Sequence, residues 1–242
     1  MLTNAGRIAT AEGAMLADWD LVGNSSTAHA DSIFDPEHWK ARNELHATPG
    51  GRGSSWFVAE DGRWVLRHYR RGGFMARLSE DRYFWRSERK VRAFAEWHLH
   101  RDMRNLGLPV PKPVAAAYRR SGFRYRCDII TERILGARPL SALIAAAALP
   151  QEAWRPLGIV LARFHRAGID HADLNAHNIL YSQIDSGFHL IDFDRGQMRG
   201  AGALGAAWQR RNLDRLHRSL IKVAPPAHFT AQQWDLMLQG YC

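Results

Sequence analysis

The sequence contains little cysteine and no long hydrophobic run, and each absence excludes classes of protein. Cys127 and Cys242 are its only cysteines among 242 residues, too few for a disulfide framework or a cysteine-rich metal site. The longest apolar run, residues 142–149, is far shorter than the roughly 20 residues that cross a bilayer. Residues 1–15 contain no continuous apolar stretch of the kind found in secretory signals. We therefore expect a chain that stays in a reducing compartment, the cytoplasm.

Lysine is scarce, and basic residues outnumber acidic ones. Lysine and arginine together number 33 against 24 acidic residues, giving a net charge of +9, and only four of the 33 are lysine. The positive excess is concentrated in residues 63–104 and 199–222. Because guanidinium groups bind phosphates and carboxylates through forked contacts, this composition predicts an anionic partner. Nucleic acid, an anionic membrane surface and a phosphorylated substrate all remain open at this point.

The pattern of residue types changes along the chain and predicts two lobes. Residues 1–47 are expected to form an N-terminal extension, with a helix start at Phe34-Asp35-Pro36. Residues 48–135 predict a sheet-rich N-lobe with one helix at 87–106, capped by Gly107, and residues 136–242 predict a mainly helical C-lobe. The runs typical of strands are 56–58, 64–69, 114–118, 125–131, 179–181 and 188–191; the helical patterns are 140–148, 152–167, 208–222 and 230–238. The predicted fold class is α+β.

The run from His171 to Asn178, together with Asp192, is best suited to chemistry. Phosphoryl transfer from ATP needs a carboxylate to accept the proton of the incoming hydroxyl, and oxygen ligands to hold Mg²⁺ against the phosphates. Asp173 and Asn178 have the spacing of the kinase catalytic loop, and Asp192 follows an apolar strand, where kinases place a metal-binding Asp-Phe-Gly. We predict Asp173 as the catalytic base, with Asn178 and Asp192 as Mg²⁺ ligands. Singly, such residues are more often turn or cap residues, and His171, Asp173 and His177 also allow a transition-metal cluster.

Residues upstream of this run are candidates for holding the phosphates of ATP. Gly51, Gly53 and Ser54 lie in a glycine-rich segment in which backbone N–H groups can approach phosphate oxygens, although a plain hairpin turn is an alternative. Arg67 stands where kinases place a strand lysine that contacts the α- and β-phosphates; the alternative is a solvated strand residue. Glu96 on the predicted helix is the expected partner of Arg67. Glu88 is the competing candidate, for which we expect a surface role.

These residues, with others along most of the chain, resemble the lipopolysaccharide kinase family of the protein-kinase-like superfamily. The resemblance is carried by Phe34-Asp35-Pro36 with Trp39, Gly51-Arg52-Gly53, the run 65–73, Glu96-Trp97, Gly107 to Pro111, the loop 171–178, Leu190 to Arg195, and Asn212-Leu213 with Arg218-Ser219-Leu220. It implies a two-lobed protein-kinase-like fold that binds ATP and Mg²⁺. It also implies phosphorylation of the 4-hydroxyl of 3-deoxy-D-manno-octulosonic acid (Kdo) on a lipid A precursor, Kdo-lipid IVA, in lipopolysaccharide inner-core biosynthesis.

The same resemblance implies a peripheral protein on the cytoplasmic side of the inner membrane. Its arginines would contact the Kdo-bearing lipid A precursor and the anionic membrane surface, and no nucleic-acid or protein partner is expected.

The sequence departs from the general protein-kinase pattern in ways that favour a small acceptor. Asp194 stands in place of the glycine after Asp192 and Phe193, Asn175 replaces the catalytic-loop lysine, and no Ala-Pro-Glu follows. The short stretch before Trp208 leaves little room for a regulated activation loop. Two alternative functions remain beside the one that the family resemblance implies. One is an aminoglycoside- or choline-type kinase; the other is a catalytically inactive module that binds anionic membrane or nucleic acid.

Overall fold

The computed structural model of the chain describes residues 5–23, 27–48, 55–70 and 81–242. The chain divides into two compact units. Unit 1 contains residues 1–101 and 112–133, and unit 2 contains residues 102–111 and 134–242. The predicted phosphate-binding residues Gly51, Gly53 and Ser54 lie outside the described residues.

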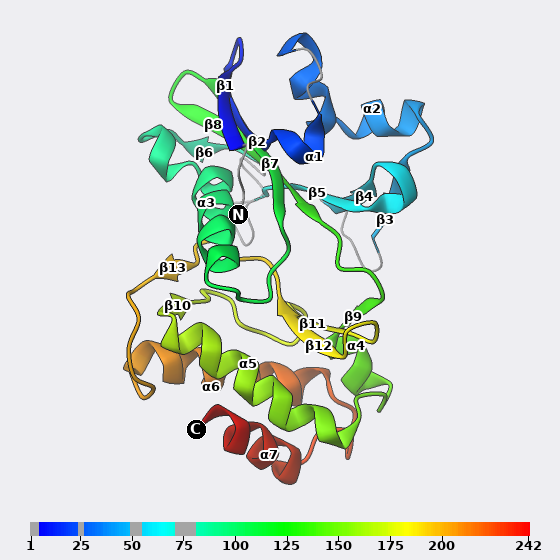
Figure 1. The fold of residues 1–242 in the computed structure, drawn as a ribbon, viewed down its shortest axis with the longest axis vertical. Helices are drawn as coiled ribbons and strands as arrows, with labels where there is room; N and C mark the ends of the chain where they lie inside the picture. The colour runs from blue at the N-terminus through cyan, green and yellow to red at the C-terminus, as the bar shows by residue number, and fades with distance from the viewer. Residues whose placement is uncertain (1–4, 24–26, 49–54, 71–80) are drawn as a thin grey trace. The chain divides into compact units, whose positions relative to one another are not determined.

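Unit 1 is built on an antiparallel sheet. Its strands follow the order β1-β2-β7-β8-β5-β4-β3, and the short strand β6 also pairs with β8 (Figure 1). The strands are β1 Ala5–Ala9, β2 Gly13–Asp18, β3 Leu45–Ala47, β4 Ser55–Val58, β5 Trp64–His68, β6 Tyr83–Phe84, β7 Pro113–Ser121 and β8 Arg124–Glu132. The predicted sheet-rich character of this part of the chain is confirmed.

Residues 1–47, which we expected as an extension, supply strands to this sheet. The hairpin of β1 and β2 adds to β7, and β3 adds to β4. Between β2 and β3 lie α1 (Trp19–Val22), the 3-10 helix η1 (Thr27–Phe34) and α2 (Pro36–Ala41). The predicted helix start is confirmed, because the Asp35 carboxylate accepts a hydrogen bond from the Glu37 N–H at 3.0 Å and Pro36 occupies the first turn.

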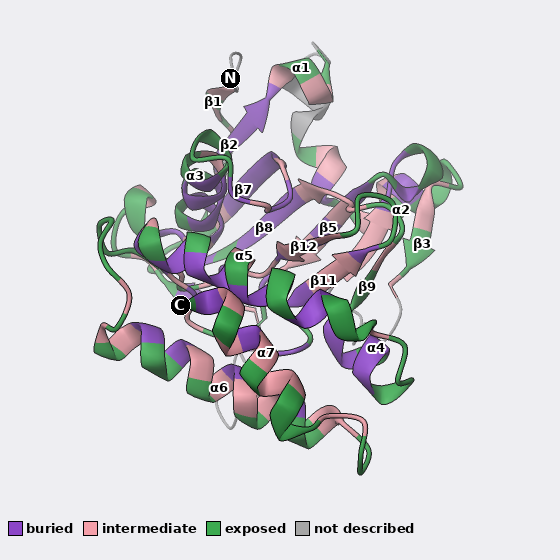
Figure 2. Ribbon diagram, turned by 60° about the horizontal axis from the view of Figure 1, so that its bottom comes forward, coloured by how far each residue is buried: buried purple, intermediate pink, exposed green. Residues whose placement is uncertain are grey.

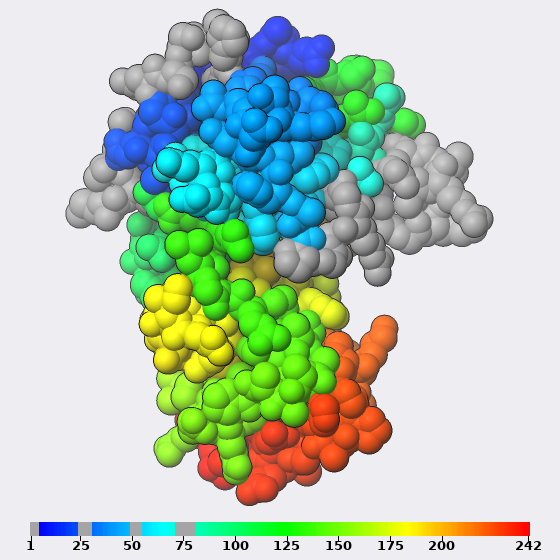
Figure 3. Space-filling model, turned by 90° about the vertical axis from the view of Figure 1, so that its right-hand side faces the viewer, coloured from blue at the N-terminus to red at the C-terminus, as the bar shows by residue number. Residues whose placement is uncertain are grey.

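The two faces of the sheet carry separate hydrophobic clusters. Side chains alternate along a strand, so the adjacent Ile129 and Ile130 of β8 belong to opposite faces. Helix α3 (Arg92–Asn105) covers one face with Phe94 and Trp97. Residues of α1, η1 and α2 cover the other face, where Trp39 is buried; Figure 3 shows the described residues of these helices in blue.

The long helix predicted at 87–106 begins later than expected. Residues Glu88–Lys90 form the 3-10 helix η4, Val91 is extended at φ −64° and ψ 125°, and α3 starts at Arg92. The predicted cap is present, because Gly107 adopts a φ of +69° and its N–H donates to the Arg104 carbonyl at 3.0 Å.

Unit 2 is mainly helical. Its helices are α4 Leu140–Ala145, α5 Trp154–Arg166, α6 Ala207–Val223 and α7 Ala231–Tyr241, and its strands are β9 Ala137–Pro139, β10 Ile169–Asp170, β11 Ile179–Ser182, β12 Gly187–Leu190 and β13 Gln197–Met198. One sheet has the order β12-β11-β9, and β10 pairs with β13. Helix α5 buries one side and exposes the other (Figure 2). None of the described helices is long and apolar enough to cross a membrane.

Helices α5 and α7 approach each other backbone to backbone. A Cβ atom placed on Gly158 of α5 would lie 1.9 Å from the Met237 carbonyl oxygen of α7. A Cβ atom placed on Gly240 of α7 would lie 2.1 Å from the Arg155 carbonyl oxygen of α5. Both separations are far below van der Waals contact, so each helix requires a glycine at the crossing.

Candidate active site

Two of the predicted motifs come together within unit 2. The loop 171–178 leads into β11, and Asp192 follows β12; these strands form an antiparallel pair with Ile179 opposite Leu190. Residues just before one strand and just after its antiparallel partner lie at the same end of the pair. The Ile191 N–H donates to the Asn178 carbonyl at 3.0 Å, which places Asn178 and Asp192 on neighbouring stretches of chain.

The imidazole of His171 ties these two stretches to each other. The Asp173 N–H donates to His171 Nδ1 at 3.2 Å, so Nδ1 acts as an acceptor and carries no proton. The ring proton therefore sits on Nε2, which donates to the Ile191 carbonyl at 3.0 Å. The buried ring also packs against Phe193, with centroids 4.5 Å apart. These contacts fix the orientation of His171, which links the loop 171–178 to the segment that follows β12.

The amide of Asn178 is held in one orientation. Its Nδ2 donates to the Asp173 carbonyl at 3.0 Å, and Asn175 Nδ2 donates to the same carbonyl at 3.0 Å. The Asn178 side chain is buried, and its Oδ1 is the end of the amide suited to a cation. The Asp173 side chain is exposed, so a carboxylate that could act as a base is accessible from solvent.

Asp192 has a strained backbone. Its φ of +63° lies in the left-handed region, which a residue with a Cβ atom adopts at a cost of about 1–3 kcal/mol. The next residue, Phe193, is buried and stacks on Phe164 with centroids 6.0 Å apart. This anchor holds the segment in place and explains how the strain persists. Such strain often accompanies a functional constraint on a side chain.

Carboxylate and amide oxygens are the ligands that Mg²⁺ prefers, and Mg²⁺ sites commonly use one or two protein side chains with phosphate oxygens completing the shell. Asn178 and Asp192 fit that description by their chemistry. Among the residues that the structure describes, no group of three or more His, Cys, Asp or Glu side chains could hold a metal ion, and this includes His171, Asp173 and His177.

A second network of hydrogen bonds, which no sequence motif predicted, supports the loop from helix α6. Asn212 Oδ1 accepts from the His171 N–H at 3.1 Å, and Asn212 Nδ2 donates to Asp170 Oδ1 at 2.9 Å. Arg199 Nε donates to Asp170 Oδ2 at 2.6 Å. Asn212 is buried, so α6 positions the start of the loop through a satisfied polar contact. The resemblance included Asn212, but nothing in its local sequence indicated these partners.

Unit 1 contains the predicted pair of Arg67 and Glu96. Arg67 on β5 donates through its terminal nitrogen to Glu96 Oε2 on α3 at 2.5 Å. The Glu96 side chain is 3% exposed and that of Arg67 is 21% exposed, so the carboxylate is the more deeply buried partner. Kinases place a comparable strand cation and helix glutamate together when active. The pairing that the sequence predicted is therefore present.

Tyr69 contacts both members of this pair, and no sequence pattern predicted its role. Its hydroxyl donates to Glu96 Oε2 and accepts from Arg67 at 3.1 Å, and the Arg67 guanidinium carbon lies 4.6 Å from the Tyr69 ring centroid. Burial, with a further contribution from Glu96, raises the pKa of the Tyr69 hydroxyl well above its usual value. The hydroxyl therefore stays protonated and remains a donor. The alternation of side chains along β5 does not reveal this contact, because Tyr69 follows the strand.

Glu88, the competing candidate, has other partners. Both of its oxygens accept from Arg7 at 2.8 Å, and Oε2 also accepts from the Tyr118 hydroxyl at 2.9 Å. The Arg7 hydrogen bonds, as the largest cause, lower the pKa of the Glu88 carboxyl. This partly exposed contact joins β1 to the start of η4, in agreement with the surface role expected for Glu88.

The strands that flank the glycine-rich segment are paired. The sequence predicted this segment in front of the first strand, whereas the structure adds β3 before it, with His46 opposite Phe57 and Ala47 opposite Trp56. The segment 49–54 therefore connects two neighbouring antiparallel strands. Phe57 is opposite Val65, two residues before Arg67, so Phe57 and Arg67 share a face of the sheet.

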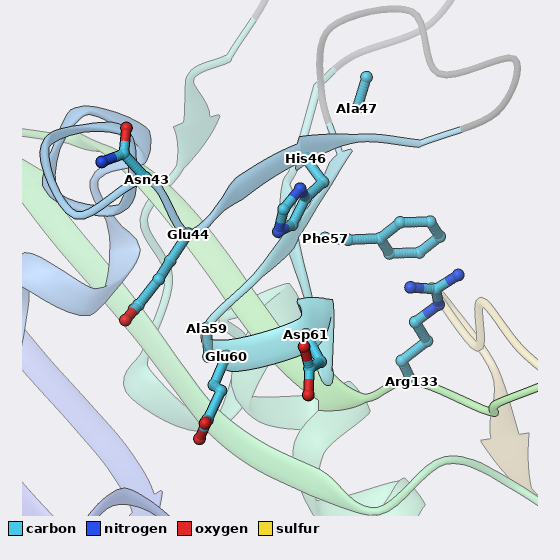
Figure 4. Close-up of a pocket in the computed structure, with 9 residues that line it drawn as sticks. All are labelled: Asn43, Glu44, His46, Ala47, Phe57, Ala59, Glu60, Asp61 and Arg133. Atoms are coloured by element: carbon cyan, nitrogen blue, oxygen red, sulfur yellow. The ribbon is translucent and has the colours of Figure 1, made fainter.

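A cavity of about 610 Å³ lies beside β3 and β4 in unit 1. Figure 4 shows its nine lining residues: Asn43, Glu44, His46, Ala47, Phe57, Ala59, Glu60, Asp61 and Arg133. The Arg133 guanidinium carbon lies 3.8 Å from the Phe57 ring centroid. The cavity therefore has an aromatic ring with a guanidinium stacked over it and several carboxylates in its lining. None of the predicted site residues lines it.

Comparison with known proteins gives consistent matches. A family model described as the lipopolysaccharide kinase (Kdo/WaaP) family matches residues 36–241. A 3-deoxy-D-manno-octulosonic acid kinase of Stenotrophomonas maltophilia strain K279a is 51% identical over 197 residues, covering 79% of this chain and 75% of the relative. The kinase of the same name from strain R551-3 is 52% identical over 202 residues, covering 81% of this chain and 76% of the relative.

A solved structure described as WaaP in complex with acyl carrier protein matches with a TM-score of 0.55 at 18% identity. The match covers 87% of this chain and 85% of that one, so the two proteins share a fold. The expected kinase-like combination of a sheet-rich and a helical part is confirmed.

Proposed function

Because the chain belongs to the lipopolysaccharide kinase (Kdo/WaaP) family, we propose that it transfers the γ-phosphoryl group of ATP to the 4-hydroxyl of Kdo on a lipid A precursor, Kdo-lipid IVA. The observation that carries this proposal is about 50% identity to named Kdo kinases over about four fifths of the chain. The protein is an ATP-dependent phosphotransferase with an alcohol group as acceptor, and it acts in lipopolysaccharide biosynthesis. Its acceptor is a Kdo-containing lipid.

Asp173 is the proposed catalytic base. Its exposed carboxylate can accept the proton of the attacking sugar hydroxyl, and the His171 and Asn178 contacts hold its backbone. Asn178 and Asp192 would hold Mg²⁺ through their oxygens, and a bound Mg²⁺ neutralises charge on the phosphates. The fixed amide of Asn178 and the strained backbone of Asp192 support this assignment.

Arg67 is the proposed contact to the phosphates of ATP. Glu96 and Tyr69 both hold its guanidinium, which leaves a preorganised cation on β5. The backbone N–H groups of Gly51, Gly53 and Ser54, between β3 and β4, are the proposed second set of phosphate contacts. Kinases usually have a lysine here, with a single ammonium group. The planar guanidinium of arginine presents several N–H donors and can bind two phosphate oxygens at once.

Peripheral association with the cytoplasmic side of the inner membrane follows from the acceptor. A lipid-linked sugar sits in a bilayer, and a chain with a net charge of +9 carries the arginines that attract anionic headgroups.

A labelling experiment tests the activity. Purified protein is incubated with γ-labelled ATP and Mg²⁺ and offered a Kdo-bearing lipid A precursor, the same lipid without Kdo, or an aminoglycoside. Label is expected on the Kdo-bearing lipid alone. Label on the aminoglycoside or on the Kdo-free lipid would support kinase activity but contradict the proposed acceptor. A folded protein that binds no ATP and transfers no label would be an inactive binding module.

Two variants test the base. Asp173→Ala should lower turnover by about 10²–10⁴-fold or more while ATP binding remains, since a general base acts in the chemical step. Asp214→Ala removes another exposed carboxylate of unit 2, on α6, and should leave turnover unchanged. Near wild-type turnover in Asp173→Ala would reject the assignment.

A further inference from the structure

An exposed aromatic cluster lies at one end of the unit 1 sheet. It consists of Phe84 on β6, Trp85, and Phe123 in the turn between β7 and β8, and we name it the aromatic tip. Phe84 is 64% exposed and Phe123 is 83% exposed. Backbone pairing brings them to the same end of the sheet, because Phe84 is opposite Arg124 and the Trp85 N–H donates to the Phe123 carbonyl at 2.9 Å. Phe84 and Trp85 are successive residues, so their side chains lie on opposite faces of this end of the sheet. Figure 1 shows β6 beside β8.

The aromatic tip is attached to a packed base. The Trp85 ring lies 5.0 Å from the Tyr118 ring and 6.0 Å from the Tyr125 ring, and both tyrosines are buried in the cluster beneath α3. The tip therefore has a defined position on the sheet. Two phenylalanines that remain exposed at the end of a well-packed sheet indicate a surface that contacts a binding partner.

Positive charge surrounds the aromatic tip. The Arg120 guanidinium carbon lies 4.8 Å from the Trp85 ring centroid, and that of Arg124 lies 5.7 Å from the Phe84 ring centroid. The segments 82–90 and 119–126 contain eight arginines or lysines and one acidic residue, Glu88. Two of these arginines pair with carboxylates just outside the segments, Arg126 with Asp81 at 2.6 Å and Arg119 with Asp128 at 3.2 Å, so cations remain in excess. Glu88 is already paired with Arg7. The surface is thus both apolar and cationic.

We propose that the aromatic tip docks the protein onto an anionic lipid bilayer, with Phe84 and Phe123 entering the interface and Arg120 and Arg124 binding lipid phosphates. Aromatic rings favour the interfacial region, and each arginine near an anionic surface adds attraction. Rings that are this exposed stand out from the protein, as insertion requires, whereas single-stranded nucleic acid is bound in grooves. The inference rests on the proposed function, which gives the protein a lipid-linked acceptor.

Vesicle flotation tests the proposal. The wild-type chain should bind vesicles of phosphatidylglycerol and phosphatidylethanolamine, and bind those of phosphatidylcholine more weakly. The double variant Phe84→Ser/Phe123→Ser should bind about 100-fold more weakly, because two aromatic side chains no longer leave water. Arg120→Glu/Arg124→Glu should lose the preference for anionic lipid. Ile184→Ser is the matched control, since Ile184 is 75% exposed in unit 2 and should not affect binding.

A second assay separates this proposal from the proposed function. In detergent micelles the Kdo-bearing acceptor is presented without a bilayer, so Phe84→Ser/Phe123→Ser should phosphorylate it at the wild-type rate. Loss of micellar activity in a variant whose circular dichroism matches wild type would overturn the docking role. So would unchanged vesicle binding, or binding of single-stranded RNA through the tip without binding of vesicles. A wild-type chain that binds vesicles through the tip but phosphorylates nothing would refute only the proposed function.

Discussion

Arg67 and Glu96 should show a large coupling energy in a double-mutant cycle of unfolding free energies, because their ion pair is largely buried in unit 1. We consider Arg67→Met, Glu96→Gln and the double variant. The Glu96 side chain is 3% exposed, so Arg67→Met leaves a buried carboxylate that keeps the Tyr69 hydroxyl as a hydrogen-bond donor and has His100 Nε2 3.7 Å from its Oε1. Removing one member of a buried pair costs more than removing both, because the isolated charge stays away from water.

The magnitude follows from the burial of the two partners. Breaking a buried pair from one side costs about 3–5 kcal/mol, and we expect the lower end, about 3 kcal/mol, for Arg67→Met. The Arg67 side chain keeps 21% of its surface exposed, and Tyr69 still donates to the carboxylate after the substitution. The double variant removes both charges, so the cycle should show a coupling of about 2 kcal/mol.

Urea unfolding at pH 7, followed by circular dichroism and tryptophan fluorescence, measures the free energies of the four proteins. The matched control is the cycle of Arg7→Met and Glu88→Gln, whose side chains are 47% and 33% exposed and are therefore expected to couple by less than about 1 kcal/mol. Equal coupling in the two cycles, or less than about 0.5 kcal/mol for Arg67 and Glu96, would refute the assignment of a buried pair.

Three further changes test the packing of unit 2. Gly158→Ala should destabilise the protein by about 1–3 kcal/mol in thermal or urea unfolding, because its Cβ meets a carbonyl of α7, whereas Gly202→Ala, with open space around it, should not. Burial lowers the pKa of His165 to about 4, so between pH 6.5 and 4 the unfolded chain binds the additional proton and stability is lost as pH falls. Urea unfolding should show a loss of about 2 kcal/mol from this residue by pH 5, and His165→Gln should remove it; an unchanged pH dependence would contradict the assignment. Asn212→Ala should lower turnover about tenfold or more while KM for ATP changes little, because the loop that carries Asp173 loses its contact to α6; steady-state kinetics with unchanged kcat would contradict this.

The parts of the fold that the sequence predicted are those with strong local signals. The β-branched and aromatic runs of β5 and β8 and the three-to-four spacing of α5 predict their elements directly. The loop 171–178 and Asp192 lie at the same end of the β11–β12 pair because the two strands form a simple hairpin, so here the kinase-like spacing follows from local structure.

The parts that the sequence did not predict depend on distant contacts. Strands β1 and β2 read AGRIA and GAMLAD, which contain a single β-branched residue, Ile8, and their pairing with β7 comes from tertiary packing. The predicted helix 140–148 ends at Ala145, and Ala147 adopts a φ of +50° that its side chain does not favour. The partners of Asn212 lie 41 and 42 residues away in sequence, beyond the reach of any local pattern.

The added hairpin of β1 and β2 also protects the protein from self-association. Strand β2 pairs with the edge of β7 along five residue pairs, which include the alanine-rich stretch Ala115–Ala117, and so provides hydrogen-bond partners for the backbone of β7. Without it, the N–H and C=O groups of β7 would form an open apolar edge, a template on which another chain can add a strand. Strand β1 ends the sheet as an edge of five residues, and a short edge limits further pairing. A chain shortened by its first 23 residues would therefore be expected to aggregate through β7.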